Sequence, residues 1–199
     1  MARPTRRTAR LFGAGAAAAC LATCAAVVWH ASYSTFSATT SNPTDNWAAG
    51  TVLLADDDAN TAMFNASNLK PGSTGTKCIA VTSTGSLASA VKLYGTGSAT
   101  TNGLSSYLNM TITQGTGGNF GSCTGFTPLA SGSGVFTGTL AAFASSATGY
   151  ANGLGSWAPT GTGSDTRVFQ ISYTFDSAAP NSTQGGTASI GFTWEAQNT

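Results

Sequence analysis

The sequence predicts an all-β domain, and three observations support this fold class. Only 8% of the 199 residues are charged, 41% are hydrophobic, and 25 glycines accompany many serines and threonines. Several stretches alternate apolar and polar residues with β-branched enrichment, the pattern of strands with one buried face. A disordered chain would carry more charge and fewer aromatic residues. We therefore expect one all-β domain over residues 35–199, which is long enough to bury a core.

The N-terminus is predicted to be a secretory signal peptide covering residues 1–34. The first ten residues carry four basic side chains: Arg3, Arg6, Arg7 and Arg10. An uncharged run over residues 11–28 follows, and small residues flank Tyr33 ahead of an expected cleavage between Ser34 and Thr35. The alternatives are a retained membrane anchor, twin-arginine export and lipid attachment at Cys24. An anchor is disfavoured because the run is mostly Ala and Gly. Twin-arginine export is disfavoured because the residues directly after Arg7 are not the apolar ones that this signal usually has, and lipid attachment because the run continues past Cys24. We therefore expect cleavage, with no membrane span remaining.

Seven stretches of the mature chain fit the strand pattern. They are residues 50–55, 62–66, 75–84, 89–94, 107–114, 166–175 and 187–196. In the clearest of them, Phe169, Ile171 and Tyr173 alternate with polar residues. Between residues 115 and 163 the pattern weakens into Gly, Ser and Thr, apart from a short helix predicted at 139–146. A loop-rich stretch of this length is typical of a functional insertion or a decorated sheet edge.

The motif Asn68, Leu69, Lys70, Pro71 and Gly72 predicts a tight turn. In a type II turn over residues 70–73, Pro71 fixes φ at the second position and Gly72 supplies a positive φ at the third. The strand that follows carries Cys78 and Ile79. This stretch therefore favours a structural joint over a binding loop.

The cysteines predict a disulfide between Cys78 and Cys123. Cys20 and Cys24 lie in the expected signal peptide, so these two remain in the mature chain. In an exported protein an even pair is most simply a disulfide. The alternative is two buried thiols.

Charge and residue types exclude several function classes. Without the four N-terminal arginines, four basic residues face seven acidic ones, so the net charge is 4 − 7 = −3. Nucleic-acid binding requires a basic footprint, which this chain lacks. The only histidine, His30, lies in the signal region, so the mature chain has no imidazole for a Ser-His-Asp triad or a zinc site. The acids are scattered and no catalytic motif occurs; we expect no enzyme.

Two groups of residues remain as candidate binding sites. Asp56, Asp57 and Asp58 could hold Ca²⁺ with Asn60 or backbone carbonyls, although consecutive acids also form solvated turns after strands. Trp47 and Trp157 could stack on sugars, or they could be rim residues of the core.

Five sequence blocks together resemble the TasA/camelysin family. They are Y-S-T-F-S at residues 33–37, W-A-A-G-T-V-L-L at 47–54, N-L-K-P-G at 68–72, G-S-L at 85–87 and F-T-W-E-A at 192–196. The resemblance covers both ends of the mature chain and hardly extends to residues 115–163, and the two cysteines suggest an actinobacterial-type variant. It implies an exported jelly-roll-like β-sandwich, cleaved by a SipW-type signal peptidase and assembled into extracellular matrix fibres. The metalloendopeptidase label of camelysin-like members fits a mature chain without histidine badly.

In such fibres the N-terminal strand of one subunit completes a sheet of the next. The corresponding residues here are Thr35, Phe36, Ser37, Ala38, Thr39 and Thr40. This short β-prone stretch precedes a linker containing Pro43 and could pair with an open sheet edge; it could equally be an ordinary first strand or a disordered tail. The predicted partners are other copies of the chain, matrix polysaccharide or matrix proteins. A monomeric surface module that binds glycan or protein is the alternative.

Overall fold

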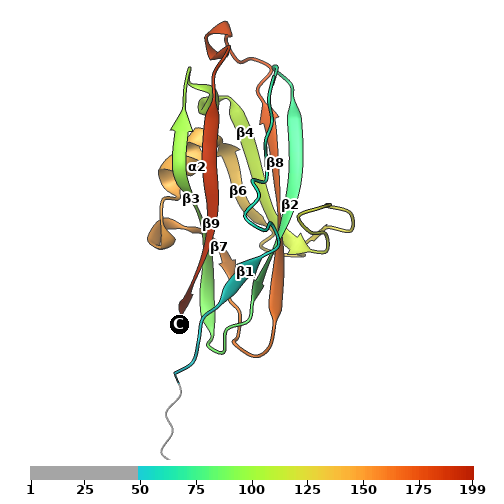
Figure 1. Cartoon of the computed structure of the whole chain (residues 1–199), viewed down its shortest axis with the longest axis vertical. Helices are drawn as coiled ribbons and strands as arrows, with labels where there is room; N and C mark the ends of the chain where they lie inside the picture. Colours follow the sequence, from blue (N-terminus) through green and yellow to red (C-terminus); the bar gives the residue numbers. More distant parts are fainter. Residues whose placement is uncertain (1–48) are drawn as a thin grey trace, which may run out of the picture. The chain divides into compact units, whose positions relative to one another are not determined.

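The computed structural model describes residues 49–199 as a sandwich of two antiparallel sheets (Figure 1). Its strands are β1 (Leu54–Asp56), β2 (Thr74–Ser83), β3 (Ser89–Thr100), β4 (Leu108–Thr116), β5 (Thr127–Pro128), β6 (Gly134–Thr139), β7 (Leu154–Trp157), β8 (Asp165–Phe175) and β9 (Ala188–Asn198). The helices are α2 (Leu140–Ser146) and three short 3-10 turns at Leu104–Ser106, Tyr150–Asn152 and Asn181–Thr183. The all-β prediction is confirmed. The predicted signal peptide, its cleavage site, the strand at residues 35–40 and Trp47 lie outside the described residues.

The larger sheet has the order β1-β2-β8-β4, with both β5 and β6 on the far side of β4. The smaller sheet has the order β7-β3-β9. β2 and β8 pair over ten residues from Thr74↔Thr174 to Ser83↔Asp165, so they form the rigid centre of the larger sheet. The C-terminus and the first described residues lie together at one end of the sandwich, called the lower end here (Figure 1).

The core follows the period-2 pattern that predicted the strands. Ile79 of β2, Ile112 of β4 and Ile171 of β8 face inward and are at most 1% exposed. Leu93 of β3 meets them from the other sheet and is also 1% exposed. Alternation therefore places one row of large apolar side chains from each strand between the sheets.

Helix α2 closes one lateral side of the sandwich, between β3 and β6 (Figure 1). Thr139 caps it, because its side-chain oxygen accepts a hydrogen bond from the backbone N–H of Ala142 at 3.1 Å. Phe143 is completely buried and packs against Phe136 and Phe192, with ring centroids 5.2 and 5.6 Å away. The prediction of a short helix in this region is confirmed.

One expectation about local structure was wrong, because residues 62–66 form no strand. The stretch 115–163, expected to be a functional insertion or a decorated sheet edge, contributes β5 and β6 beside β4, β7 beside β3, and helix α2. β6 and β7 escaped the pattern because their sequences, G-V-F-T-G-T and L-G-S-W, are short and contain glycines. Apart from the loop at 117–126, much of this stretch is therefore part of the fold.

Candidate functional site

The lateral side opposite α2, between β2 and β9, contains an apolar groove of about 1220 Å³. Its floor and walls are inward-facing side chains of both sheets. Among them are Ile79, Met110, Ile171, Tyr173, Ile190 and Phe192. Among the described residues that line it, only Asp58 and Lys70 are charged. The groove therefore suits an extended, uncharged apolar or hydroxylated guest.

Two sheet edges flank this groove. Among the described residues, β9 pairs only with β3, so its other edge has no strand neighbour. β1 pairs with β2 only at residues 81–83, and the remainder of that β2 edge also has no strand beside it. The β2 edge is partly blocked, since the Ala80 N–H donates to Asp57 Oδ1 at 2.8 Å. An incoming strand would find β9 to be the longer and less obstructed edge.

Residues 57–73 cross the open side as an irregular segment (Figure 1). Met63 is 8% exposed, and the Phe64 ring packs edge-on against Tyr173 with centroids 5.3 Å apart. Within the described chain, residues 62–69 make no hydrogen bond through their backbone. The apolar side chains of Met63, Phe64 and Leu69 therefore hold this segment over the groove, and no strand pairing with the described residues does.

Left-handed backbone conformations mark both ends of this segment. Ala59 and Asn60 have φ of 51° and 61°, and Asn68 has φ of 55°. Asn tolerates this region, whereas a non-glycine residue such as Ala59 pays roughly 1–2 kcal/mol of conformational strain. The chain therefore changes direction sharply on entering and on leaving residues 62–67.

One residue that lines the groove carries an unpaired polar atom. Trp194 packs at a tilt against Phe169 with ring centroids 5.2 Å apart, and its buried Nε1 has no hydrogen-bond partner among the described residues. An unpaired buried donor costs about 1–3 kcal/mol.

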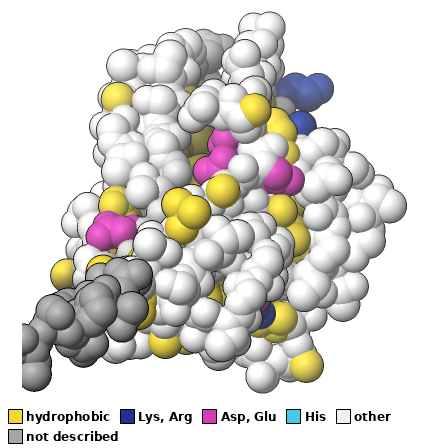
Figure 2. All heavy atoms as spheres, turned by 60° about the horizontal axis from the view of Figure 1, so that its bottom comes forward, with side chains coloured by type: hydrophobic (Ala, Val, Ile, Leu, Met, Phe, Trp, Pro, Cys, Tyr) yellow, Lys and Arg dark blue, Asp and Glu magenta, His cyan; other side chains and the backbone are white. Residues whose placement is uncertain are grey.

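The three consecutive aspartates occupy different environments beside β1. Asp57 is structural, because its two carboxylate oxygens accept the N–H groups of Ala80 and Phe120, both at 2.8 Å. Asp58 accepts the N–H of Asn60 at 2.7 Å. Partial burial raises the pKa of Asp56, and so do the hydrogen bond that its protonated carboxyl donates to the Asp58 side chain and the negative charge of Asp58. In Figure 2, which brings the lower end forward, acidic side chains lie beside exposed hydrophobic ones.

No metal centre is assembled from these acids. Among residues 49–199, no three His, Cys, Asp or Glu side chains come close enough together to hold an ion. Because Asp57 already uses both oxygens for backbone N–H groups, only Asp56 and Asp58 are left from the predicted set. Calcium binding stays a prediction.

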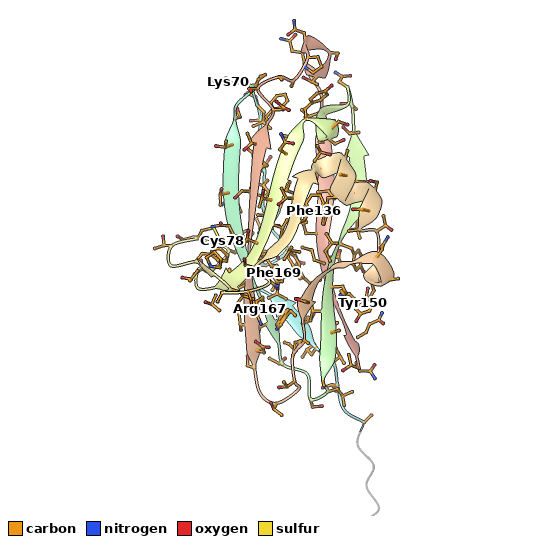
Figure 3. All side chains as sticks on the ribbon, turned by 180° about the vertical axis from the view of Figure 1, so that it is seen from behind. Lys70, Cys78, Phe136, Tyr150, Arg167 and Phe169 are labelled. Carbon is orange, nitrogen blue, oxygen red and sulfur yellow. A yellow bond between two sulfur atoms is a disulfide. The ribbon has the colours of Figure 1, made fainter. Side chains whose placement is uncertain are left out.

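The predicted disulfide and turn are both present. Cys78 and Cys123 are bonded with Cα atoms 5.3 Å apart, which ties the loop at 117–126 to β2. Gly72 has φ of 88° and the Ser73 N–H donates to the Lys70 carbonyl at 2.8 Å, as a type II turn requires. The turn lies at the upper end of the sandwich, where Figure 3 labels Lys70. It is a joint between the segment over the groove and β2.

Of the two alternatives for Trp157, a sugar-stacking residue or a residue at the rim of the core, the structure favours the core. Trp157 is 3% exposed, its Nε1 donates to Asp165 Oδ2 at 2.9 Å, and the Arg167 guanidinium lies 5.9 Å from its ring centre. Figure 3 shows Arg167 close to Phe169 in the lower half of the sandwich. Trp157 is therefore a core residue of β7, and the idea of a glycan-binding module loses one of its two tryptophans.

The groove itself escaped the sequence analysis. One feature of the sequence could have pointed to it: residues 62–66 fit a strand, yet no neighbouring stretch is an obvious hairpin partner for that strand.

Among residues 49–199, none of the helices is long and apolar enough to cross a membrane. No protein-family model matches the chain, and a search of curated proteins finds no match either.

Proposed function

We propose that this chain is a secreted structural protein of the cell surface or extracellular matrix whose subunits assemble into fibres. Residues 35–40 of one subunit enter the groove of the next and pair with the open edge of β9. The observation that carries this proposal is the apolar groove beside an edge strand of 11 residues. An edge of that length is usually protected in a protein that stays monomeric.

The composition of residues 35–40 fits the groove. The stretch T-F-S-A-T-T has no charge and one large apolar side chain, Phe36. Burial of that ring between the sheets contributes about 1.5–3 kcal/mol, and pairing with β9 fixes the register.

The connection to the domain allows the strand to reach a neighbour. The first described residues run beside the β2–β3 turn, where Ser86 and Leu87 donate to the Thr51 carbonyl. Ten residues, 41–50, separate Thr51 from the predicted strand and can span roughly 35 Å when extended. Each subunit then offers a strand and a groove on different surfaces, so contacts are head-to-tail and propagate as a filament.

Two further observations support the proposal. The Cys78–Cys123 disulfide fits an oxidising, extracytoplasmic compartment. The sequence blocks at residues 33–37, 47–54, 68–72, 85–87 and 192–196 resemble those of TasA/camelysin fibre proteins. The peptidase label within that family has no support in this chain, because its only histidine is His30. We accordingly propose a structural role without catalysis.

The test is assembly of the mature chain beginning at Thr35. We expect filaments or large oligomers by electron microscopy and sedimentation. Deletion of residues 35–40, or Phe36→Asp, should abolish them while leaving the circular dichroism spectrum and a cooperative melt nearly intact. Phe36→Leu is the matched control, since it keeps an apolar side chain, and it should still assemble. A parent chain that stays monomeric at high concentration across pH and ionic strength would contradict the proposal.

A further inference from the structure

We propose that residues 62–69 are the second, inducible edge of the acceptor groove. When a donated strand pairs with β9, this segment forms backbone hydrogen bonds with the strand's other edge, so that the guest lies between two partners. The inference rests on the proposed function, because its guest is residues 35–40 of a second copy.

The placement of the segment supports this inference. Residues 188–192 of β9 and residues 60–71 both line the same groove. A strand that uses one edge for β9 would turn its other edge toward the irregular segment. An inserted strand has two rows of N–H and C=O groups, and a row left facing an apolar wall would be costly.

The segment has the free hydrogen-bonding capacity that such pairing requires. Its backbone makes no hydrogen bond to other described residues between positions 62 and 69. The sequence A-M-F-N-A at 62–66 predicts a strand, yet no strand forms. The strand preference of these residues would be satisfied once a donated strand pairs with them.

Both ends of the segment are fixed, while its middle is held lightly. At one end, Asp57 accepts two backbone N–H groups; at the other, the Gly72 N–H donates to the Phe175 carbonyl at 2.8 Å. Between them, the main attachments are the side chains of Met63, Phe64 and Leu69. The middle can therefore straighten into a strand without releasing either end or any existing backbone hydrogen bond.

Hydrogen–deuterium exchange on the unmodified mature chain tests the inference. The reference is the chain without residues 35–40, in which amides 62–69 should exchange rapidly. In filaments of the mature chain we expect these amides to slow by about 100-fold or more, together with the free-edge amides of β9. Filaments in which residues 62–69 exchange as fast as in the reference overturn the inference while leaving the proposed function intact.

Two other exchange outcomes bear on the proposed function. If no filaments form, donation itself fails, and the inference fails with it. If a monomeric mature chain already protects residues 62–69, the strand occupies its own groove, and pairing with a second copy is overturned.

A pair of adjacent proline variants separates pairing from simple coverage. Ala66→Pro and Ser67→Pro each remove one N–H, and in a strand adjacent N–H groups point to opposite edges. Neither N–H has a partner among the described residues, so both monomers should remain folded. We expect one variant to raise the critical concentration for assembly about fivefold and the other to behave like the parent chain. Equal effects of both variants, or no effect of either, would overturn the pairing.

Discussion

Loss of the Cys78–Cys123 cross-link should lower the free energy of unfolding by about 4 kcal/mol. The bond closes a loop of 45 residues, for which the chain-entropy relation gives about 13 cal/mol/K, or about 4 kcal/mol at 25 °C. For a domain of this size, the melting temperature should fall by roughly 8–16 °C. The loss is carried by the unfolded state, which gains freedom when the loop opens.

Cys123→Ala is the cleaner of the two single variants. Cys78 is 1% exposed on β2, so its replacement would add a packing defect to the loss of the cross-link. Cys123 lies on the loop at 117–126 and is less buried. Comparison of the two variants therefore separates the cross-link from the buried side chain.

Urea denaturation of dilute, monomeric protein measures this effect. The free energy of unfolding of the oxidised parent chain should be about 4 kcal/mol higher than that of Cys123→Ala and that of the parent chain with its disulfide reduced. A difference below about 1 kcal/mol would refute the loop-entropy argument. Two alkylatable thiols in protein folded under oxidising conditions would refute the disulfide itself.

Three more predictions concern the core and the groove. Trp194→Phe removes a buried N–H that has no partner among the described residues, so monomer stability in urea unfolding should stay equal or rise slightly. Phe143→Ala should lower the free energy of unfolding, measured in urea, by about 3–5 kcal/mol because the ring is completely buried. The control is Leu87→Ala, at a side chain 37% exposed, which should change it by less than about 0.5 kcal/mol. The raised pKa of Asp56 destabilises the fold at pH values above it, so Asp56→Asn should be more stable than the parent chain at pH 7. That advantage should disappear below the ordinary pKa of 3.8, where Asp56 is protonated in both states; an advantage that persists at low pH would show another origin.

Sequence reasoning succeeded where one buried face repeats over many residues. Phe169, Ile171 and Phe175 set the phase of β8, and β2, β4 and β9 were found within about two residues by the same rule. The turn at residues 70–73 was predictable because Pro71 and Gly72 each impose one backbone angle. The disulfide followed from the cysteine count.

The remaining features depend on long-range packing that a period cannot reveal. Trp157 looked exposed because it stands among Gly, Ser and Thr, yet Asp165 and Arg167 of β8 enclose it. Residues 62–66 carry a strand-like pattern without a described partner. The groove depends on β2 and β9 being edges of different sheets, and this neighbour relation spans more than 100 residues of sequence.

Photo-crosslinking from position 36 tests strand donation most directly. Unlabelled mature chain carrying benzoylphenylalanine in place of Phe36 would be co-assembled with nitrogen-15-labelled parent chain and irradiated. We predict crosslinks from unlabelled residue 36 to labelled peptides that contain residues 188–194 or 60–71. Crosslinks confined to the same chain, or directed to the outward-facing residues Asn109 and Thr111 of β4, would contradict donation into the groove.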